Sequence, residues 1–173
     1  MVEMSVNPRA ERPWMPDYGV DTPEWEPLPW SWAAERLGAN RNFWVVTASA
    51  DGRPHALPVW GVWNDDEGRF AFSCSPRARK ARNLAGNPHA VVMTDDTVEC
   101  LSVEGQAGSV SDEQRQAQWI ERYLDKYRPM APDLSADFLR QHLMLEFVPE
   151  RAFAIIERED DFATRATRWV FQD

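Results

Sequence analysis

Residues 43–74 read FWVVTASADGRPHALPVWGVWNDDEGRFAFSC, and this stretch decides the fold. It is rich in β-branched and aromatic residues, which favour strands. Asp51-Gly52 is a strong hairpin signal, and Pro54 and Pro58 place the strand that follows at an edge or a bulge. Strands are predicted at 43–49, 53–63 and 69–74, separated by a second, polar turn at 64–68. The stretch therefore predicts a three-stranded antiparallel meander.

Helices and further strands surround this meander. Ser75-Pro76 predicts a helix start, with serine as N-cap and proline at the first helical position, and Gly86-Asn87-Pro88 ends that helix. The other predicted elements are helices at 30–39 and 111–127, strands at 90–94 and 98–110, an antiparallel pair at 141–148 and 152–157 around Pro149, and a short strand at 167–171. Antiparallel strands dominate, so we predict a mainly β, Greek-key-like barrel with peripheral helices.

The composition is typical of one soluble globular domain of 173 residues. A net charge of −9 argues against binding to nucleic acid, which needs a cationic surface. No apolar run is long enough for a transmembrane helix, and Met1–Arg12 lacks an apolar leader segment. We therefore expect a cytoplasmic protein with no membrane partner.

Residues 1–30 form a Pro/Trp-rich arm that differs in composition from residues 31–173. Its prolines exclude a regular helix or central strand, whereas Trp14, Trp25 and Trp30 make it too apolar for a plain disordered tail. We expect an extended arm on the folded body or on a partner subunit. A mostly disordered extension is the alternative.

A cationic island lies where the helix after the meander begins. Phosphate binds readily at a helix N-terminus, which carries free N–H groups and a partial positive charge. Basic side chains oppose that dipole, and a bound anion would offset the repulsion. The residues of this candidate anion site are Arg77, Arg79, Lys80 and Arg82, with hydroxyl donors from Ser73 and Ser75. A solvated basic helix face is the alternative interpretation.

A second feature is the strand at 57–63, where Trp60, Gly61 and Trp63 would let a planar ring lie against backbone. Ordinary barrel core is the alternative for this strand.

Other chemistries lack their signatures. Glycine-rich nucleotide loops and a Gly-x-Ser-x-Gly elbow are absent. Cys74 and Cys100 are interpreted as buried free thiols, since free cysteine is among the most buried residue types. His55, His89 and His142 lie in different segments, so we predict no metal site.

Several pieces occur in a recognisable order: DGRPHALPVW at 51–60, FAFS at 70–73, RKARNL at 79–84, NP at 87–88, VEGQA at 103–107 and ATRW at 166–169. Together, over residues 31–171, they resemble the pyridoxamine 5′-phosphate oxidase-like split-barrel superfamily, and most of all its branch that uses the deazaflavin coenzyme F420. The resemblance implies a six- to seven-stranded antiparallel split β-barrel. It also implies a homodimer with cofactor sites at the interface.

The resemblance assigns residues to the cofactor. It implies that the phosphate is held by Lys80, Arg79, Ser73 and Ser75, to which the charge argument adds Arg77. It implies that the tricyclic ring lies along Pro58, Val59 and Trp60. Asn83 belongs to the same helix motif and is either a cofactor contact or structural. Gln106 and Trp169 match regions that approach the site from the other subunit.

The activity implied is that of an oxidoreductase in which reduced F420 passes a hydride to a small electron-poor molecule. The cofactor carries this chemistry, so no catalytic side chain is assigned. Two alternatives stay open: an FMN-dependent oxidase or flavin reductase, and a non-catalytic flavin-, F420- or haem-binding protein. The extra arginines favour the longer polyanionic tail of F420 over FMN. Pyridoxamine phosphate oxidation is not expected, because we find no further basic and polar residues for a phosphorylated substrate.

Overall fold

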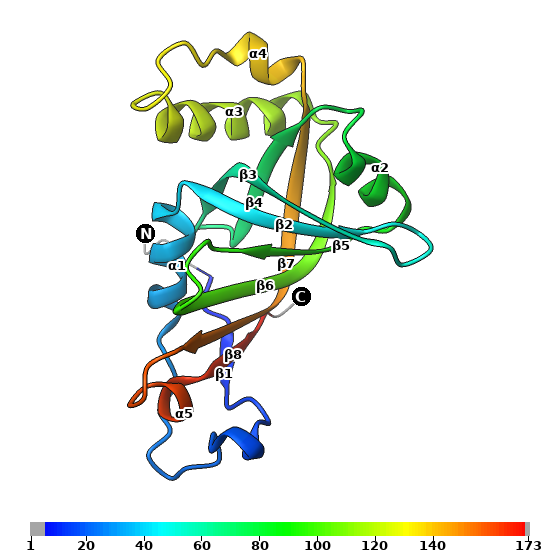
Figure 1. Cartoon of the computed structure of the whole chain (residues 1–173). Coiled ribbons are helices and arrows are strands. Elements are labelled where there is room, and N and C mark those ends of the chain that lie inside the picture. The colour runs from blue at the N-terminus through cyan, green and yellow to red at the C-terminus, as the bar shows by residue number, and fades with distance from the viewer. Residues whose placement is uncertain (1–5, 172–173) are drawn as a thin grey trace.

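The computed structural model describes residues 6–171, so the ends of the expected arm and barrel domain, 1–5 and 172–173, lie outside the described residues. An antiparallel sheet closes on itself in the order β7-β4-β3-β2-β5-β6, because β6 also pairs with β7 (Figure 1). β1 and β8 extend the sheet beyond β7. The described strands are β1 Arg9–Glu11, β2 Asn42–Ala48, β3 Pro54–Asn64, β4 Arg69–Cys74, β5 His89–Met93, β6 Glu99–Ser109, β7 Leu143–Ile156 and β8 Thr167–Val170. The predicted mainly β fold with a six- to seven-stranded antiparallel barrel and peripheral helices is confirmed.

Helices cover several sides of the barrel (Figure 1). α3 and α4 lie across one end, α2 lies on the side of the β2–β3 hairpin, and α1 lies on the opposite side. The described helices are the 3-10 helix η1 Pro16–Tyr18 and the α-helices α1 Trp30–Ala39, α2 Arg79–Gly86, α3 Glu113–Tyr127, α4 Ala136–Arg140 and α5 Phe162–Arg165. The sequence predicts α1 and α3 but not the short α4 and α5. Within residues 6–171, no helix is long and apolar enough to cross a membrane.

The meander is present, but its middle strand changes partner. β3 pairs with β2 from Pro54 to Trp60 and with β4 from Gly61 to Asn64. Glycine is required at the change, because a Cβ atom on Gly61 would collide with the Phe70 ring. One edge of β3 therefore has no strand partner between residues 54 and 60 in the described chain. We call this opening between β3 and the end of β4 the split.

The predicted strand pair around Pro149 is wrong, because residues 143–156 form one long strand, β7. A register shift pairs Glu104 with Arg151 but Gly105 with Pro149, so Glu150 is the extra residue of a bulge. A bulge accommodates proline, which has no N–H for the ladder. A Cβ on Gly105 would collide with the Val148 carbonyl, so glycine lets the strands approach. The proline therefore bends the strand and does not reverse it.

The described part of the N-terminal arm, residues 6–29, lies on the folded body. β1 pairs with β8, and Val20 and Leu28 are buried. Trp25 donates its Nε1–H to the Ala166 carbonyl at 2.7 Å. The arm thus lies beside the C-terminal strand, at the end of the molecule away from α2 and α3 (Figure 1).

Two clusters of buried side chains hold the fold together. The larger one fills the barrel and includes Phe43, Phe72 and Trp169. The smaller one fixes α3 to β3 and β4 through Trp119 and Ile120, with Tyr123, Tyr127 and other side chains. Complete burial of a large apolar side chain contributes about 1.5–3 kcal/mol, so α3 is firmly held against the strands that border the split.

Candidate functional site

Helix α2 begins later than the sequence predicts. Its first residue is Arg79, and residues 75–78 form a turn in which Ala78 N–H donates to the Ser75 carbonyl at 2.9 Å. The Ser75 hydroxyl accepts from Arg77 N–H at 3.2 Å and is not the helix cap. The predicted Ser75 cap and Pro76 start are therefore wrong, because this local serine turn competes with the helix for the same hydroxyl. The helix cap is Ala78, which has no side-chain acceptor, so the first N–H groups lack a side-chain partner.

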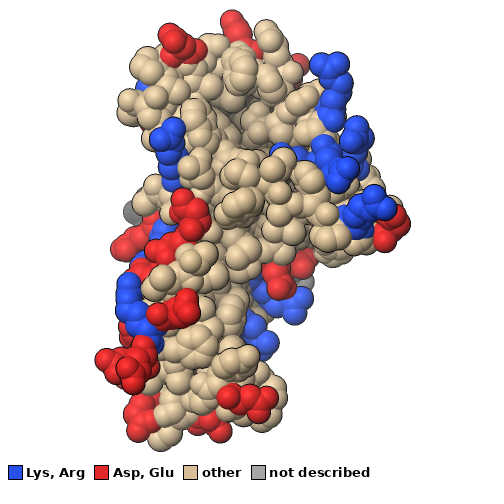
Figure 2. All heavy atoms as spheres, viewed as in Figure 1, with Lys and Arg blue, Asp and Glu red and all other residues tan. Residues whose placement is uncertain are grey.

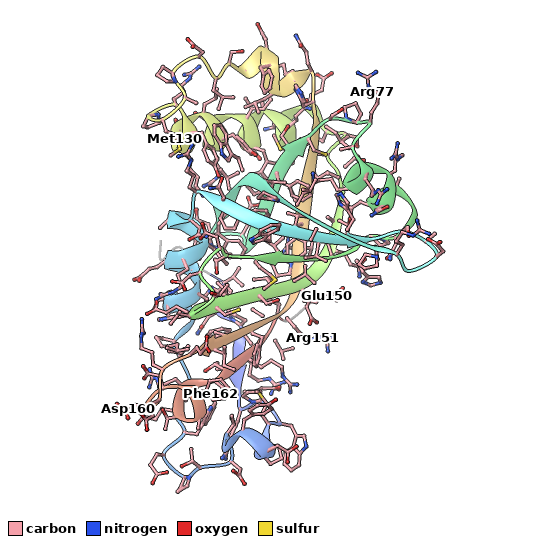
Figure 3. The ribbon with its side chains drawn as sticks, viewed as in Figure 1. Arg77, Met130, Glu150, Arg151, Asp160 and Phe162 are labelled. Carbon is pink, nitrogen blue, oxygen red and sulfur yellow. The ribbon has the colours of Figure 1, made fainter. Side chains whose placement is uncertain are left out.

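The later start brings the cations closer to the helix terminus. Arg79 and Lys80 occupy the first turn, which has no acidic residue, and Arg77 lies in the preceding turn. Figure 2 shows Lys and Arg atoms gathered on this edge of the molecule, and Figure 3 shows Arg77 extending outward from it. No ion pair within residues 6–171 involves Arg77, Arg79, Lys80 or Arg82.

Lys80 is the unusual member of this group, since its residue is only 7% exposed whereas the three arginines are exposed. Lysine is almost never so buried unless it is paired. No carboxylate of the described chain forms an ion pair with it, so its charge is available to an anionic ligand. This observation fits a phosphate group.

His55 joins this cluster, although the sequence argument considered it only as a metal ligand. It pairs with Thr47 across β2 and β3, and the Thr47 hydroxyl accepts from Asn83 Nδ2 of α2 at 2.9 Å. The His55 Nδ1 atom is buried without a hydrogen-bond partner. Burial lowers the pKa of His55, and the charges of Lys80 and Arg79 lower it further. The sequence feature that could have indicated His55 is its position in the run RPHA at residues 53–56 of the meander.

Asn83 makes a structural contact in the described chain, and its cofactor role stays a prediction. It is buried, and its amide joins α2 to β2 through Thr47. This bond fixes the helix face that carries Lys80 against the barrel.

The residues predicted to bind the ring lie on the stretch of β3 that pairs with β2 alone in the described chain. Pro58 is exposed, and Val59 and Trp60 are half-buried. The Trp60 ring stacks on Tyr127 at a centroid distance of 4.5 Å and an interplanar angle of 2°. Because its side chain is held by α3, Trp60 presents a fixed backbone at the split. Ser73 and Ser75 lie at the end of β4, on the other side of this opening.

Gln106 and Trp169 are not brought to this site within one chain. Gln106 is exposed on β6 and donates to Glu150 of the bulge at 2.6 Å. Trp169 is 0% exposed in the barrel core, where it packs edge-on against Trp30 at 5.4 Å. A side chain without exposed surface cannot contact a partner's cofactor, so the structure argues against that role for Trp169.

The cysteines and histidines form no metal centre in the described residues. Cys74 and Cys100 are free and half-buried, and no group of three or more His, Cys, Asp or Glu side chains lies together within residues 6–171.

The structural class of this protein is a split antiparallel barrel. A basic helix start lies beside the strand edge that has no strand partner in the described chain. A family model for pyridoxamine 5′-phosphate oxidase matches residues 23–155. The chain belongs to the pyridoxamine 5′-phosphate oxidase family. The superfamily predicted from the sequence is thereby confirmed, whereas its F420 branch is not.

Solved structures with this fold include proteins with different described roles. HutZ, the haem storage protein of Vibrio cholerae, is 24% identical with a TM-score of 0.60, over 72% of this chain and 92% of HutZ. A conserved hypothetical protein from Mycobacterium tuberculosis is 19% identical with a TM-score of 0.61, over 76% of this chain and 86% of its own. An F420 reductase is 20% identical with a TM-score of 0.54, over 68% of this chain and 93% of its own. Identities at this level show a shared fold.

Proposed function

We propose that this protein is a cytoplasmic oxidoreductase that binds coenzyme F420 at the split and uses it to transfer hydride to a small electron-poor organic substrate. The observation that carries the proposal is the buried, unpaired Lys80 in the uncapped first turn of α2, beside the free edge of β3. A helix start with surplus positive charge and open N–H groups suits a phosphate group.

Each group of residues has a role in this proposal. Lys80 and Arg79, with Arg77 and the hydroxyls of Ser73 and Ser75, would hold the phosphate. The backbone of residues 58–60 would run along the ring. The bound reduced deazaflavin supplies the hydride, while the chain binds, orients and shields it. No side chain is assigned to proton transfer, since water can serve.

The number of cations favours F420 over FMN. Arg77, Arg79, Lys80 and Arg82 are all free of ion pairs in the described chain, which is more positive charge than one phosphate requires. Coenzyme F420 carries further negative charges along its tail. FMN is the alternative cofactor, for an oxidase or flavin reductase, because the same lysine and helix start would hold its phosphate.

A non-catalytic role is the alternative that the likeness to HutZ favours. A protein that only stores or senses a flavin, F420 or haem would bind its ligand tightly without turnover. Rapid reoxidation of the bound, reduced cofactor by quinones or nitroaromatic compounds would exclude this alternative.

We further propose a homodimer with the cofactor sites at the interface. Trp44 alternates with the buried Phe43 and Val45, so it faces outward, and it is 42% exposed beside Pro58 and Met93. Leu57 is 47% exposed at the free edge of β3, on the opposite face from Trp44, because it pairs with the inward-facing Val45. A second copy would cover the exposed face of Trp44, which continues into Pro58 of the ring-binding residues. Trp44→Glu should then yield a monomer in light scattering and weaken cofactor binding, whereas an unchanged dimer would exclude this surface.

The decisive experiment titrates the apo-protein with F420 and, in parallel, with FMN, and follows cofactor fluorescence. Micromolar or tighter binding of F420 with weaker FMN binding would support the proposal and justify a screen of quinones, enoates and nitro compounds. Preference for FMN would move the protein to the flavin oxidase or flavin reductase side. Binding of neither cofactor would overturn the anion site at Lys80.

A further inference from the structure

β3 changes partner between Trp60 and Gly61. On each side of this change, one position of the ladder, here called a rung, lacks its strand–strand hydrogen bonds. The last β3–β4 pair is Gly61 with Phe72, so Trp60 and Ser73 would form the next rung. The last β2–β3 pair at this end is Asn42 with Trp60, so the following rung would join Arg41 to Gly61. Buried backbone groups need hydrogen-bond partners, and α3 supplies them at both rungs.

Tyr123 occupies the missing rung between β3 and β4. Its hydroxyl donates to the Trp60 carbonyl and accepts from Ser73 N–H at 3.4 Å. These two backbone groups would otherwise be positioned to bond each other. The hydroxyl therefore takes the place of a strand–strand hydrogen bond at the apex of the split.

Tyr127, one helical turn later, occupies the missing rung between β2 and β3. Its hydroxyl accepts from Gly61 N–H at 2.8 Å and lies 2.8 Å from the Arg41 carbonyl. Lys126 donates to the Gly61 carbonyl at 2.9 Å, which leaves the Tyr127 proton free for Arg41. Both sides of the crossover are thus held by one face of α3.

The protonation states suit these roles. Burial raises the pKa of Tyr123 well above its ordinary value and raises that of Tyr127 to about 12, so both hydroxyls are donors at neutral pH. Tyr123 is 3% exposed and Tyr127 is fully buried. Neither hydroxyl can exchange its partners readily for water.

We propose that Tyr123 is a positioning residue for the cofactor. Its hydroxyl bridges β3 and β4 at the residue pair where the two strands no longer bond each other, and so it sets the distance between Trp60 and Ser73. Trp60 is assigned to the ring and Ser73 to the phosphate, so the inference rests on the proposed function. A ligand that spans both sides requires the correct spacing. A ligand that occupies only one side does not.

The test uses Tyr123→Phe in the full chain, with three ligands followed by fluorescence or calorimetry. FMN spans ring and phosphate, riboflavin has the ring alone, and inorganic phosphate has neither ring nor ribityl chain. We expect FMN to bind about tenfold more weakly to the variant, while riboflavin and phosphate change by less than about twofold. Hydrogen exchange at the Ser73 amide should become faster.

The matched control is Tyr127→Phe, which removes a similar buried hydroxyl from the same helix, on the β2–β3 side. It should lower the melting temperature about as much as Tyr123→Phe does but leave FMN affinity within about threefold of the wild type. Thermal unfolding of each variant establishes that the comparison is made between folded proteins.

The outcomes separate the two proposals. If the wild type binds FMN and Tyr123→Phe binds it with equal affinity, the positioning role is overturned and the proposed function stays intact. An equal loss for all three ligands, or for both tyrosine variants, would reduce Tyr123 to a structural residue. Failure of the wild type to bind FMN or F420 would overturn both proposals.

Discussion

The two helices that border the split, α2 and α3, differ in how far the chain satisfies their polar groups. The N-cap of α3 is Asp112, whose side chain accepts from Arg115 N–H at 3.3 Å, and Arg115 pairs with Glu67 and Glu146. The N-cap of α2 is Ala78, which offers no side-chain acceptor, and the cations of α2 have no acidic partner in the described chain. The polar groups at the start of α3 are satisfied by the chain itself, whereas those at the start of α2 are not. This difference is the basis for proposing a ligand site at α2 and a supporting role for α3.

Lys80→Ala tests α2, whose first turn has no side-chain cap and no acidic partner in the described chain. This variant should have the largest effect on cofactor affinity. Loss of a charge-assisted hydrogen bond to phosphate should weaken F420 or FMN binding by about 1.5–3 kcal/mol. Folding should barely change, because Lys80 has no ion pair in the described chain to lose. Fluorescence titration and thermal unfolding measure the two effects, with Arg122→Ala on α3 as the control cation. Unchanged affinity for both cofactors would remove the phosphate assignment.

Arg115→Ala tests α3, whose polar groups are satisfied by the chain. This variant should lower the free energy of unfolding and leave cofactor affinity unchanged. Its guanidinium holds Glu146 at 2.6 Å, and Trp119 also donates to that carboxylate at 2.5 Å. The Arg115 side chain is 24% exposed. We therefore expect a loss of about 1–2 kcal/mol in unfolding free energy, below the range for fully buried pairs. Urea denaturation gives this value, and a larger effect on cofactor affinity than on stability would contradict the comparison.

Arg115 also pairs with Glu67, and this second ion pair makes a pH prediction. Arg115 lowers the pKa of Glu67, so the pair's stabilisation is present above the ordinary glutamate pKa and is lost as the pH falls through the lowered value. The acid limb of the stability curve should therefore flatten in Arg115→Ala. An unchanged acid limb would show that Glu67 contributes nothing through this pair.

Exchange of the caps sharpens the comparison further. Asp112→Ala removes the cap of α3 and should destabilise the protein by about 1 kcal/mol. Ala78→Asp adds a cap to α2 and should stabilise the apo-protein by up to about 1 kcal/mol. The new carboxylate would also compete with phosphate, so the cofactor should bind more weakly. Tighter cofactor binding by Ala78→Asp would exclude an anion at this helix start.

The smallest expected effect is the pH dependence that His55 brings to α2. Burial and the charges of Lys80 and Arg79 lower its pKa, so it is neutral at neutral pH. Without ligand, the unfolded chain then binds the proton more readily, and stability should fall as the pH drops below the ordinary histidine pKa. A phosphate beside Lys80 would raise the His55 pKa, so affinity should increase as the pH falls toward this value. Titrations across this range should give a flat response in His55→Gln, and an equal slope in the variant would assign the proton uptake elsewhere.

Two mispredicted segments show what local patterns miss. Pro149 reads as a break between strands, yet Gly105 on the neighbouring strand accommodates it in a bulge of one continuous strand. Ser75-Pro76 reads as a helix start, yet the Ser75 hydroxyl is used in a local turn, and α2 begins at Arg79. The first outcome depended on the neighbouring strand, and the second on a local turn that uses the serine hydroxyl.

The sequence by itself determined the antiparallel meander and the cationic start of α2. Alternating β-branched residues, the Asp51-Gly52 turn and adjacent arginines act over a few positions, where spacing along the chain equals proximity in space. Only the tertiary structure decided that Lys80 is buried without a carboxylate, that His55 lies beside it, and that Tyr123 and Tyr127 fill the rungs at the crossover of β3. These tyrosines meet backbone groups 50 to 86 positions away in the chain. Such contacts exist only once the barrel has closed and α3 has packed across its end, so no local pattern encodes them.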